Sequence, residues 1–153
     1  MTSTSIYVEQ FKRVERSYQR LVEINNGKIH VRESDFLFDD YLNFFMNCYH
    51  LKDWIKNDPT MKSGDEKLVE EFISNSKCLS ICGDIANGAK HFTLTSSRSC
   101  SNIKRGNAQF KLILDEIPQI SAKYTYIVDG IPMDAFDLAT QCLQDWNIFI
   151  RRL

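Results

Sequence analysis

A long apolar segment, FLFDDYLNFFMNCYHLKDWIK at residues 36–56, constrains the fold of this chain more than any other feature. Ser34 or Asp35 can cap a helix at its start, and Asn-Asp-Pro at 57–59 ends it. Because successive residues are rotated by about 100°, the polar side chains occupy only one narrow line, and the remaining surface of the helix is apolar. Such a helix needs neighbours on several sides, so we predict that it lies at the centre of the fold. The polar line consists of Asp39, Asn43, Asn47 and His50.

Other segments show the three- and four-residue spacing of helices that bury one face. One stretch is interrupted by Ser-Asn-Ser at 74–76, three residues that favour caps or turns, so we expect a break there. These helices are predicted at about residues 5–25, 65–73 and 77–91, and from Pro132 or Asp134 to the end of the chain.

The spacing changes between the last two of these helices. Residues 95–107 are rich in serine and are predicted to form a loop. The next two runs, AQFKLILDE and AKYTYIVDG, are rich in β-branched and aromatic residues, and Pro118 lies in the segment between them. They predict a hairpin at about residues 108–129. The fold class is therefore mainly α: a single domain, residues 1–153, with an antiparallel bundle of four to five helices and a small two- or three-stranded antiparallel sheet inserted before the C-terminal helix.

The composition fits a reduced, water-soluble protein. Neither a basic leader at Met1 nor an apolar run of the length that spans a bilayer is present, so a cytoplasmic location without membrane contact is expected. The five cysteines form no C-x-x-C pair, which argues against a disulfide framework or a zinc ribbon. Cys48, Cys78 and Cys82 have apolar neighbours and are expected to pack as small hydrophobic residues. No cofactor and no metal site are predicted.

One edge of the predicted helix at 77–91 is the first candidate site. Ser80, Asp84, Asn87 and His91 fall within about 60° of one another, opposite the apolar stripe. A carboxylate, an amide and an imidazole in this arrangement could hold a phosphate or supply the acid and base for proton transfer. An ordinary solvated face explains the same pattern.

His50 is the second candidate, with Asp53 and Trp54 nearby in the sequence. A histidine in a nearly all-apolar helix is expected to be a hydrogen-bonded core residue, although a ligand-binding role stays open. His50, Asp84 and His91 could converge only if the chain turns back at 74–76. A metal site with two histidines and one carboxylate would need that convergence, and the ligand spacing does not support it.

The segments CYHLKDWI and DIANGAKH, on successive predicted helices, resemble those of bacterial proteins of the HEPN superfamily. The resemblance covers about residues 35–95 and implies a helical bundle that is commonly dimeric. Many HEPN domains are metal-independent ribonucleases of toxin and phage-defence systems, with an Arg followed after about four to six residues by a His. No Arg stands at that spacing before His91, so only His91, with Asn87 between, matches the motif.

A basic region follows. No acidic residue occurs from Ile85 to Leu114, and the serines of this region add small hydrogen-bond donors, so RNA or a nucleotide could bind there. A flexible solvated loop would have the same composition. The basic residues are Lys90, Arg98, Lys104, Arg105 and Lys111.

Two functions remain in competition. The first is a non-catalytic, HEPN-like binding or interaction module that associates with itself, with a partner protein, or with RNA or a nucleotide, in a bacterial stress or defence system. The alternative is a metal-independent ribonuclease or nucleotide-processing enzyme, in which His91 acts with Asp84 and Asn87 while Lys90 and Arg98 offset negative charge. A homodimer is expected because large apolar side chains exceed what a small bundle can bury. They are Phe44, Phe45, Trp54, Trp146 and Phe149.

Overall fold

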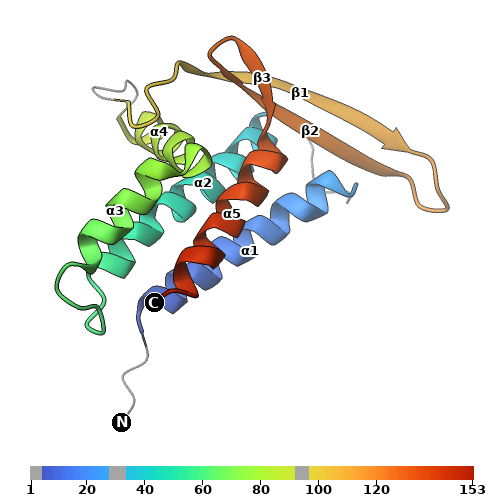
Figure 1. Cartoon of the computed structure of the whole chain (residues 1–153). Coiled ribbons are helices and arrows are strands. Elements are labelled where there is room, and N and C mark those ends of the chain that lie inside the picture. The colour runs from blue at the N-terminus through green and yellow to red at the C-terminus, as the bar shows by residue number, and fades with distance from the viewer. Residues whose placement is uncertain (1–4, 28–33, 92–96) are drawn as a thin grey trace.

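The computed structural model describes residues 5–27, 34–91 and 97–153, except for the side chains of residues 34 and 89–91. It is mainly helical and has one three-stranded antiparallel sheet. The sheet covers one end of the helices, and the C-terminus lies at the other end (Figure 1). The elements are α1 (Tyr7–Asn25), α2 (Ser34–Lys56), α3 (Asp65–Asn75), α4 (Lys77–His91), β1 (Ile103–Ile113), β2 (Gln119–Val128), β3 (Ile131–Asp134) and α5 (Ala135–Ile150).

The predicted break between α3 and α4 is confirmed at Ser76. Its backbone is extended, with φ −94° and ψ 116°, and therefore leaves the helical path. The Ser76 hydroxyl accepts a hydrogen bond from the Leu79 amide at 3.0 Å and donates one to the Asp145 carboxylate of α5 at 2.6 Å. The serine thus caps the start of α4 and joins this corner to the last helix.

The central position predicted for α2 is also confirmed. This helix contacts α1, α3, α4, α5 and β2, and Tyr41, Phe44 and Phe45 are among its fully buried side chains. The predicted polar line of α2 faces outward. Asp39, Asn43 and His50 are exposed, and the half-buried Asn47 accepts a hydrogen bond from Gln10 of α1. The expectation that His50 is a core histidine is therefore wrong, because the polar line lies on the side of α2 that its neighbours leave open.

The sheet is larger than the hairpin predicted at 108–129. Three strands pair in the order β1-β2-β3, and β1 begins at Ile103, within the segment predicted to be loop. Pro132, a predicted start of the last helix, lies in β3, whereas Asp134 caps α5 by accepting a hydrogen bond from the Asp137 amide at 2.9 Å. The register of β1 shifts at a bulge between Arg105 and Ala108, which explains why this strand lacks a regular alternating pattern.

Gly106 makes this bulge possible. A Cβ atom at this position would overlap the carbonyl group of Thr125 on β2. Only glycine allows the two backbones to approach this closely, so the glycine that weakens the strand signal in the sequence is required by the strand pairing.

One face of the sheet packs on α2 through aromatic side chains. Tyr124 stacks with Tyr41 at 5.8 Å between ring centroids, and Tyr126 meets Phe45 edge-on at 5.7 Å. These contacts join the sheet to the same core as the helices.

The large apolar side chains of α2 and α5 are covered within one chain. Phe44, Phe45, Trp146 and Phe149 are buried, and Trp54 is half-buried beneath the guanidinium of Arg13 at 5.1 Å. The apolar surplus on which the homodimer prediction rested therefore does not exist at these residues.

In the part of the chain that the structure describes, no helix combines the length and the apolarity needed to cross a bilayer.

Candidate functional site

Asp84 holds residues 97–99 against α4. Its side chain is only 2% exposed, and both of its carboxylate oxygens accept hydrogen bonds. One oxygen accepts the Arg98 amide at 2.6 Å. The other accepts the Ser99 amide at 3.0 Å, the Ser97 hydroxyl at 2.8 Å and the Ser99 hydroxyl. The carboxylate therefore organises residues 97–99 against the helix, and its charge is balanced by hydrogen bonds to backbone and hydroxyl donors.

The predicted polar edge of α4 is therefore not a solvated face where its side chains are described. Ser80 is buried and donates to the Ile73 carbonyl at 2.8 Å, and Asn87 is half-buried. The side chains of His91 and Lys90 lie outside the described part of the chain. Ser80 and Asp84 of this edge are therefore hydrogen-bonded within the protein.

Arg98 leaves the anchored segment and reaches back to α3. Its guanidinium pairs with the Glu70 carboxylate and donates to the Glu70 carbonyl at 3.2 Å and to the Tyr49 hydroxyl at 3.2 Å. Lys56 of α2 also pairs with Glu70. Burial, and then repulsion from Lys52, lower the pKa of Lys56. Glu70 thus pairs with two cations and ties Arg98 into the fold.

Tyr49 and Gly83 are site residues that the sequence reasoning missed. The Tyr49 ring lies against α4 at Gly83, where an added Cβ atom would come within 2.7 Å of the ring. Within the CYHLKDWI segment, Tyr49 therefore packs on α4, whereas its neighbour His50 is exposed. A glycine inside a predicted helix was the available signal, because it permits close approach of another group.

Two of the predicted phosphate-binding cations are engaged within the chain. Arg98 pairs with Glu70, and Arg105 pairs with Asp35 at 2.9 Å while lying 3.8 Å above the Phe38 ring. Hydrogen bonding to Asp35 raises the pKa of Arg105. Lys104 and Lys111 are exposed on β1.

The predicted site residues whose side chains the structure describes do not gather into one site. His50 is exposed on α2, whereas Asp84 is enclosed by residues 97–99. The predicted convergence with His91 depends on a side chain outside the described part of the chain.

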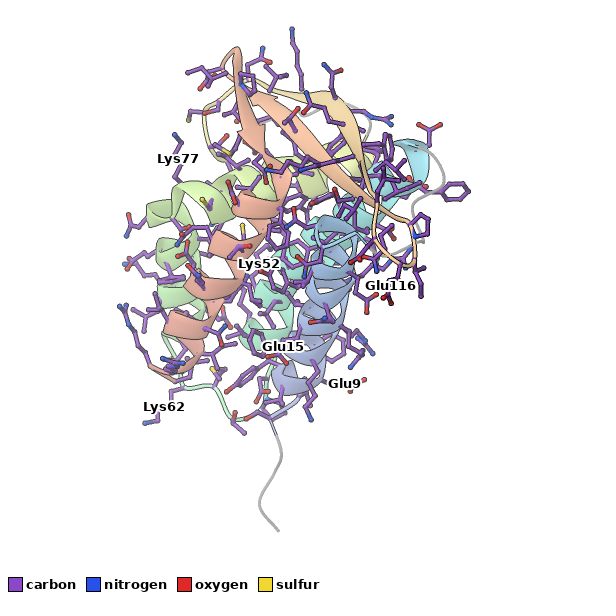
Figure 2. All side chains as sticks on the ribbon, turned by 90° about the vertical axis from the view of Figure 1, so that its right-hand side faces the viewer. Glu9, Glu15, Lys52, Lys62, Lys77 and Glu116 are labelled. Carbon is purple, nitrogen blue, oxygen red and sulfur yellow. The ribbon has the colours of Figure 1, made fainter. Side chains whose placement is uncertain are left out.

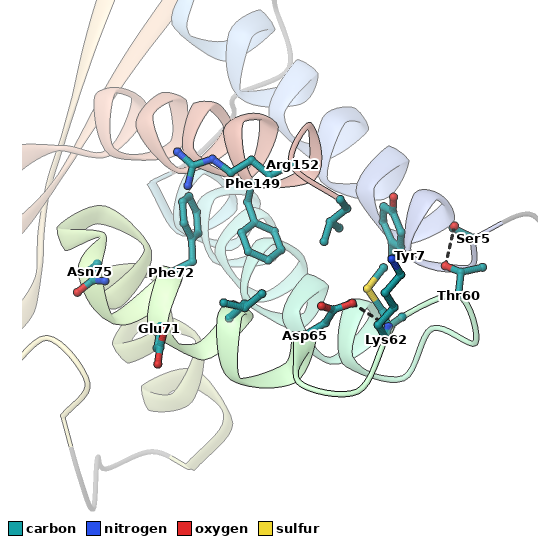
Figure 3. A pocket seen from close by; sticks show the side chains of 13 residues that line it. Ser5, Tyr7, Thr60, Lys62, Asp65, Glu71, Phe72, Asn75, Phe149 and Arg152 are labelled. Atoms are coloured by element: carbon teal, nitrogen blue, oxygen red, sulfur yellow. Dashed lines mark hydrogen bonds between the residues drawn. The ribbon is translucent and has the colours of Figure 1, made fainter.

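A cavity of about 550 Å³ lies at the end of the helices away from the sheet (Figure 3). It opens between the start of α1, the start of α3 and the chain's C-terminal end. Its charged side chains include both signs, and several are already engaged. Asp65 accepts the Lys62 amide at 2.7 Å, and the Arg152 guanidinium lies 5.9 Å from the Phe72 ring centroid. This balance of charge favours no particular ligand chemistry.

Three cysteine side chains meet inside the protein. Cys48 of α2, Cys82 of α4 and Cys142 of α5 are fully buried, and their sulfur atoms lie within 4.8 Å of one another. The Cys82 thiol donates to the Phe45 carbonyl at 3.3 Å. The predicted packing of Cys48 and Cys82 as small buried residues is confirmed. Their convergence with Cys142 was missed, because it depends on how three helices pack.

The environment makes these thiols unequal. Burial favours the neutral form of Cys48, but the neighbouring side chains of Cys142, Cys82 and Trp146 outweigh it and lower the Cys48 pKa. Burial raises the pKa of Cys82 and of Cys142 well above the usual thiol value.

No protein-family model, curated protein or solved structure matches the chain. The chemistry of its candidate sites therefore rests on their own geometry. Two regions carry it: the exposed sheet and the buried cysteine cluster.

Proposed function

We propose that the chain is a non-catalytic interaction module, of the HEPN-like kind that its sequence resembles, and that it works by associating with a second copy of itself. The observation that carries this proposal is the exposed apolar surface of the β1–β2 hairpin. The described portion of the competing catalytic site lacks an available acid or base.

Asp84 is the carboxylate on which the enzyme alternative depends. A general acid or base must come within hydrogen-bond distance of the substrate proton. Both Asp84 oxygens are already held by residues 97–99, so a substrate could reach them only after that segment had moved away. Loss of RNA cleavage in His91→Ala, with an unchanged melting temperature, would support the ribonuclease alternative and contradict the non-catalytic proposal.

The hairpin of β1 and β2 extends past the helices (Figure 1). Phe110 pairs with Ala122 and Leu112 with Ile120, so these four residues share the face of the sheet that is buried further along at Tyr124. Beyond the helices this face loses its cover, and Leu112 is 58% exposed. Apolar surface gathered in this way is typical of a protein–protein contact. The exposed apolar arm consists of Phe110, Leu112, Leu114, Ile117 and Ile120.

The exposed apolar arm is expected to bind a second copy of the chain. In the described part of the chain β1 is the outer strand of the sheet, with β2 on one side and no strand on the other. Two copies of β1 paired antiparallel about a two-fold axis would join their sheets edge to edge and place their apolar faces side by side, so that Leu112 of one copy lies near the apolar residues of the other.

The charges of the hairpin favour the same arrangement. Lys104 lies near the start of β1, whereas Asp115 and Glu116 follow its end, and Figure 2 shows Glu116 at the outer turn. Antiparallel pairing brings the basic start of one strand beside the acidic turn of the other. This complementarity sets the register and opposes a parallel arrangement.

Sedimentation equilibrium over a range of protein concentrations tests the proposal. We expect the wild type to dimerise and Leu112→Asp to be monomeric, because the substitution places a charge in the apolar contact. Leu68→Asp is the matched control, since Leu68 of α3 is 54% exposed and lies outside the hairpin. A wild-type monomer at every concentration, or equal weakening by both substitutions, would contradict the proposal.

RNA binding would give a different result in the same series. An affinity for RNA that falls steeply with salt, and falls further when Lys104 and Lys111 are replaced by alanine, would assign the hairpin to nucleic acid instead of a second copy. Self-association responds to Leu112→Asp, whereas phosphate contacts respond to these lysines.

A further inference from the structure

The cysteine cluster brings together three soft donor atoms and no hard ones. Cys48, Cys82 and Cys142 come from three different helices and are separated widely in the sequence, yet their sulfur atoms lie within 4.8 Å of one another. Among the described residues, no carboxylate or imidazole joins this group. Sulfur donors without oxygen or nitrogen select soft metal ions over Mg²⁺, Ca²⁺ or Mn²⁺.

The spacing of the sulfur atoms suits a single ion. With metal–sulfur bonds of about 2.3 Å, three sulfur atoms around one ion lie about 4 Å apart. The limit of 4.8 Å is compatible with that separation after small rotations of the side chains. All three side chains are fully buried, so their helices hold them in place without competition from solvent.

The number of donors favours one ion over the others. Structural zinc sites are almost always four-coordinate, whereas only three sulfur donors meet here. Cu(I) is soft, prefers sulfur, and accepts three-fold coordination.

We propose that Cys48, Cys82 and Cys142 form a three-sulfur binding site for Cu(I) in the core of the protein. Each thiol that becomes a thiolate ligand releases one proton, and no electron is transferred, because copper enters and remains as Cu(I). The ion would join α2, α4 and α5 from within. The site is independent of the hairpin contact and goes beyond the proposed self-association.

The test uses the full chain, reduced and free of oxygen. Because the cluster is enclosed, the chain is refolded from denaturant with Cu(I) held by a weak chelator, and unbound copper is then removed by gel filtration. We expect one Cu(I) per chain, a sulfur-to-copper charge-transfer absorption, and a higher melting temperature than in the metal-free protein. Refolded wild type that retains no stoichiometric Cu(I), or that retains Zn²⁺ more tightly than Cu(I), would overturn the assignment.

Variants locate the site. Cys142→Ser is expected to lower the affinity for Cu(I) by more than about tenfold, because it removes a ligand. The control carries Cys78→Ser and Cys100→Ser, which remove a half-buried and an exposed thiol outside the cluster, and it is expected to bind as the wild type does. Equal retention by Cys142→Ser, or loss in the control, would contradict the site.

A second measurement needs no variant and remains valid if Cys142→Ser fails to fold. Alkylation of the wild type in mild denaturant, read by mass spectrometry, should be slower at Cys48, Cys82 and Cys142 with Cu(I) than in the metal-free protein, while Cys100 reacts equally in both. Equal rates at the three cysteines with and without Cu(I), or an equal slowing at Cys100, would overturn the proposal.

Discussion

The core around α2 encloses large apolar side chains, whereas the outer half of the β1–β2 hairpin leaves them exposed to solvent. In the core, Phe44, Phe45 and Trp146 are fully buried. Along the hairpin, Leu112 of β1 and Leu114 just after it are exposed, although the other end of the same sheet is covered. A surface that binds a partner is therefore expected on the hairpin. The core can only stabilise the fold or hold an ion inside it. The proposed dimer and the proposed Cu(I) site follow this division.

The largest expected effect compares one side chain from each region. Trp146→Ala removes a fully buried indole that donates to the Cys48 carbonyl at 3.1 Å, and we expect it to lower the free energy of unfolding by about 3–5 kcal/mol. Leu114→Ala, at a position that is 82% exposed, should change the free energy of unfolding by less than about 0.5 kcal/mol. Urea unfolding at a concentration below dimerisation measures both. A comparable loss of unfolding free energy in the two variants would contradict this difference between core and hairpin.

A smaller effect is expected at Asp84, whose role is to hold residues 97–99. Asp84→Ala leaves the amides of Arg98 and Ser99 without their acceptor, so the free energy of unfolding should fall by about 2–3 kcal/mol. Hydrogen exchange at these two amides should accelerate before the helices unfold. Asp39→Ala, at an exposed carboxylate of α2, is the control and should alter neither quantity. Unchanged exchange in Asp84→Ala would show that the segment does not depend on this carboxylate.

The smallest expected effect is the contribution of Asp58 to the pH dependence of the free energy of unfolding. Burial opposes ionisation of this carboxyl, but hydrogen bonds from Thr60 and from the Tyr7 amide outweigh it and hold its pKa below the ordinary 3.8. A group with a lowered pKa in the folded state stabilises the protein above its unfolded pKa, and this stabilisation is lost as pH falls below 3.8 toward the folded value. Asp58→Asn should therefore lose less stability than the wild type between pH 5 and pH 2 in urea unfolding. Identical pH profiles for the two proteins would show that Asp58 does not contribute.

The sequence predicted the helices well because their signals are local. The spacing of apolar residues marks each helix, Asn-Asp-Pro at 57–59 ends α2, and Ser76 marks the break before α4. The start of β1 was missed because Lys104, Arg105 and Gly106 carry no strand signal of their own. These residues become a strand by pairing with β2, a contact between distant parts of the chain.

At the candidate sites, too, the sequence predicted local geometry but not contacts between distant parts of the chain. The alignment of Ser80 and Asp84 along one edge of α4 follows from helix geometry. That Asp84 is covered by residues 97–99, and that Arg98 reaches Glu70, depend on the path of the chain after the helix. The position of His50 was predicted wrongly, because a helical pattern shows which residues share a face but not which face the neighbours leave open.

The amino-acid sequence by itself determined the approximate positions of the helices and which of their faces are apolar, since both depend on residues a few positions apart. Only the tertiary structure decided that the apolar face of the sheet continues past its cover, and that Cys48, Cys82 and Cys142 meet. The physical reason is that such contacts depend on the relative positions of whole helices and strands, which are set by packing across the entire core and by no single segment.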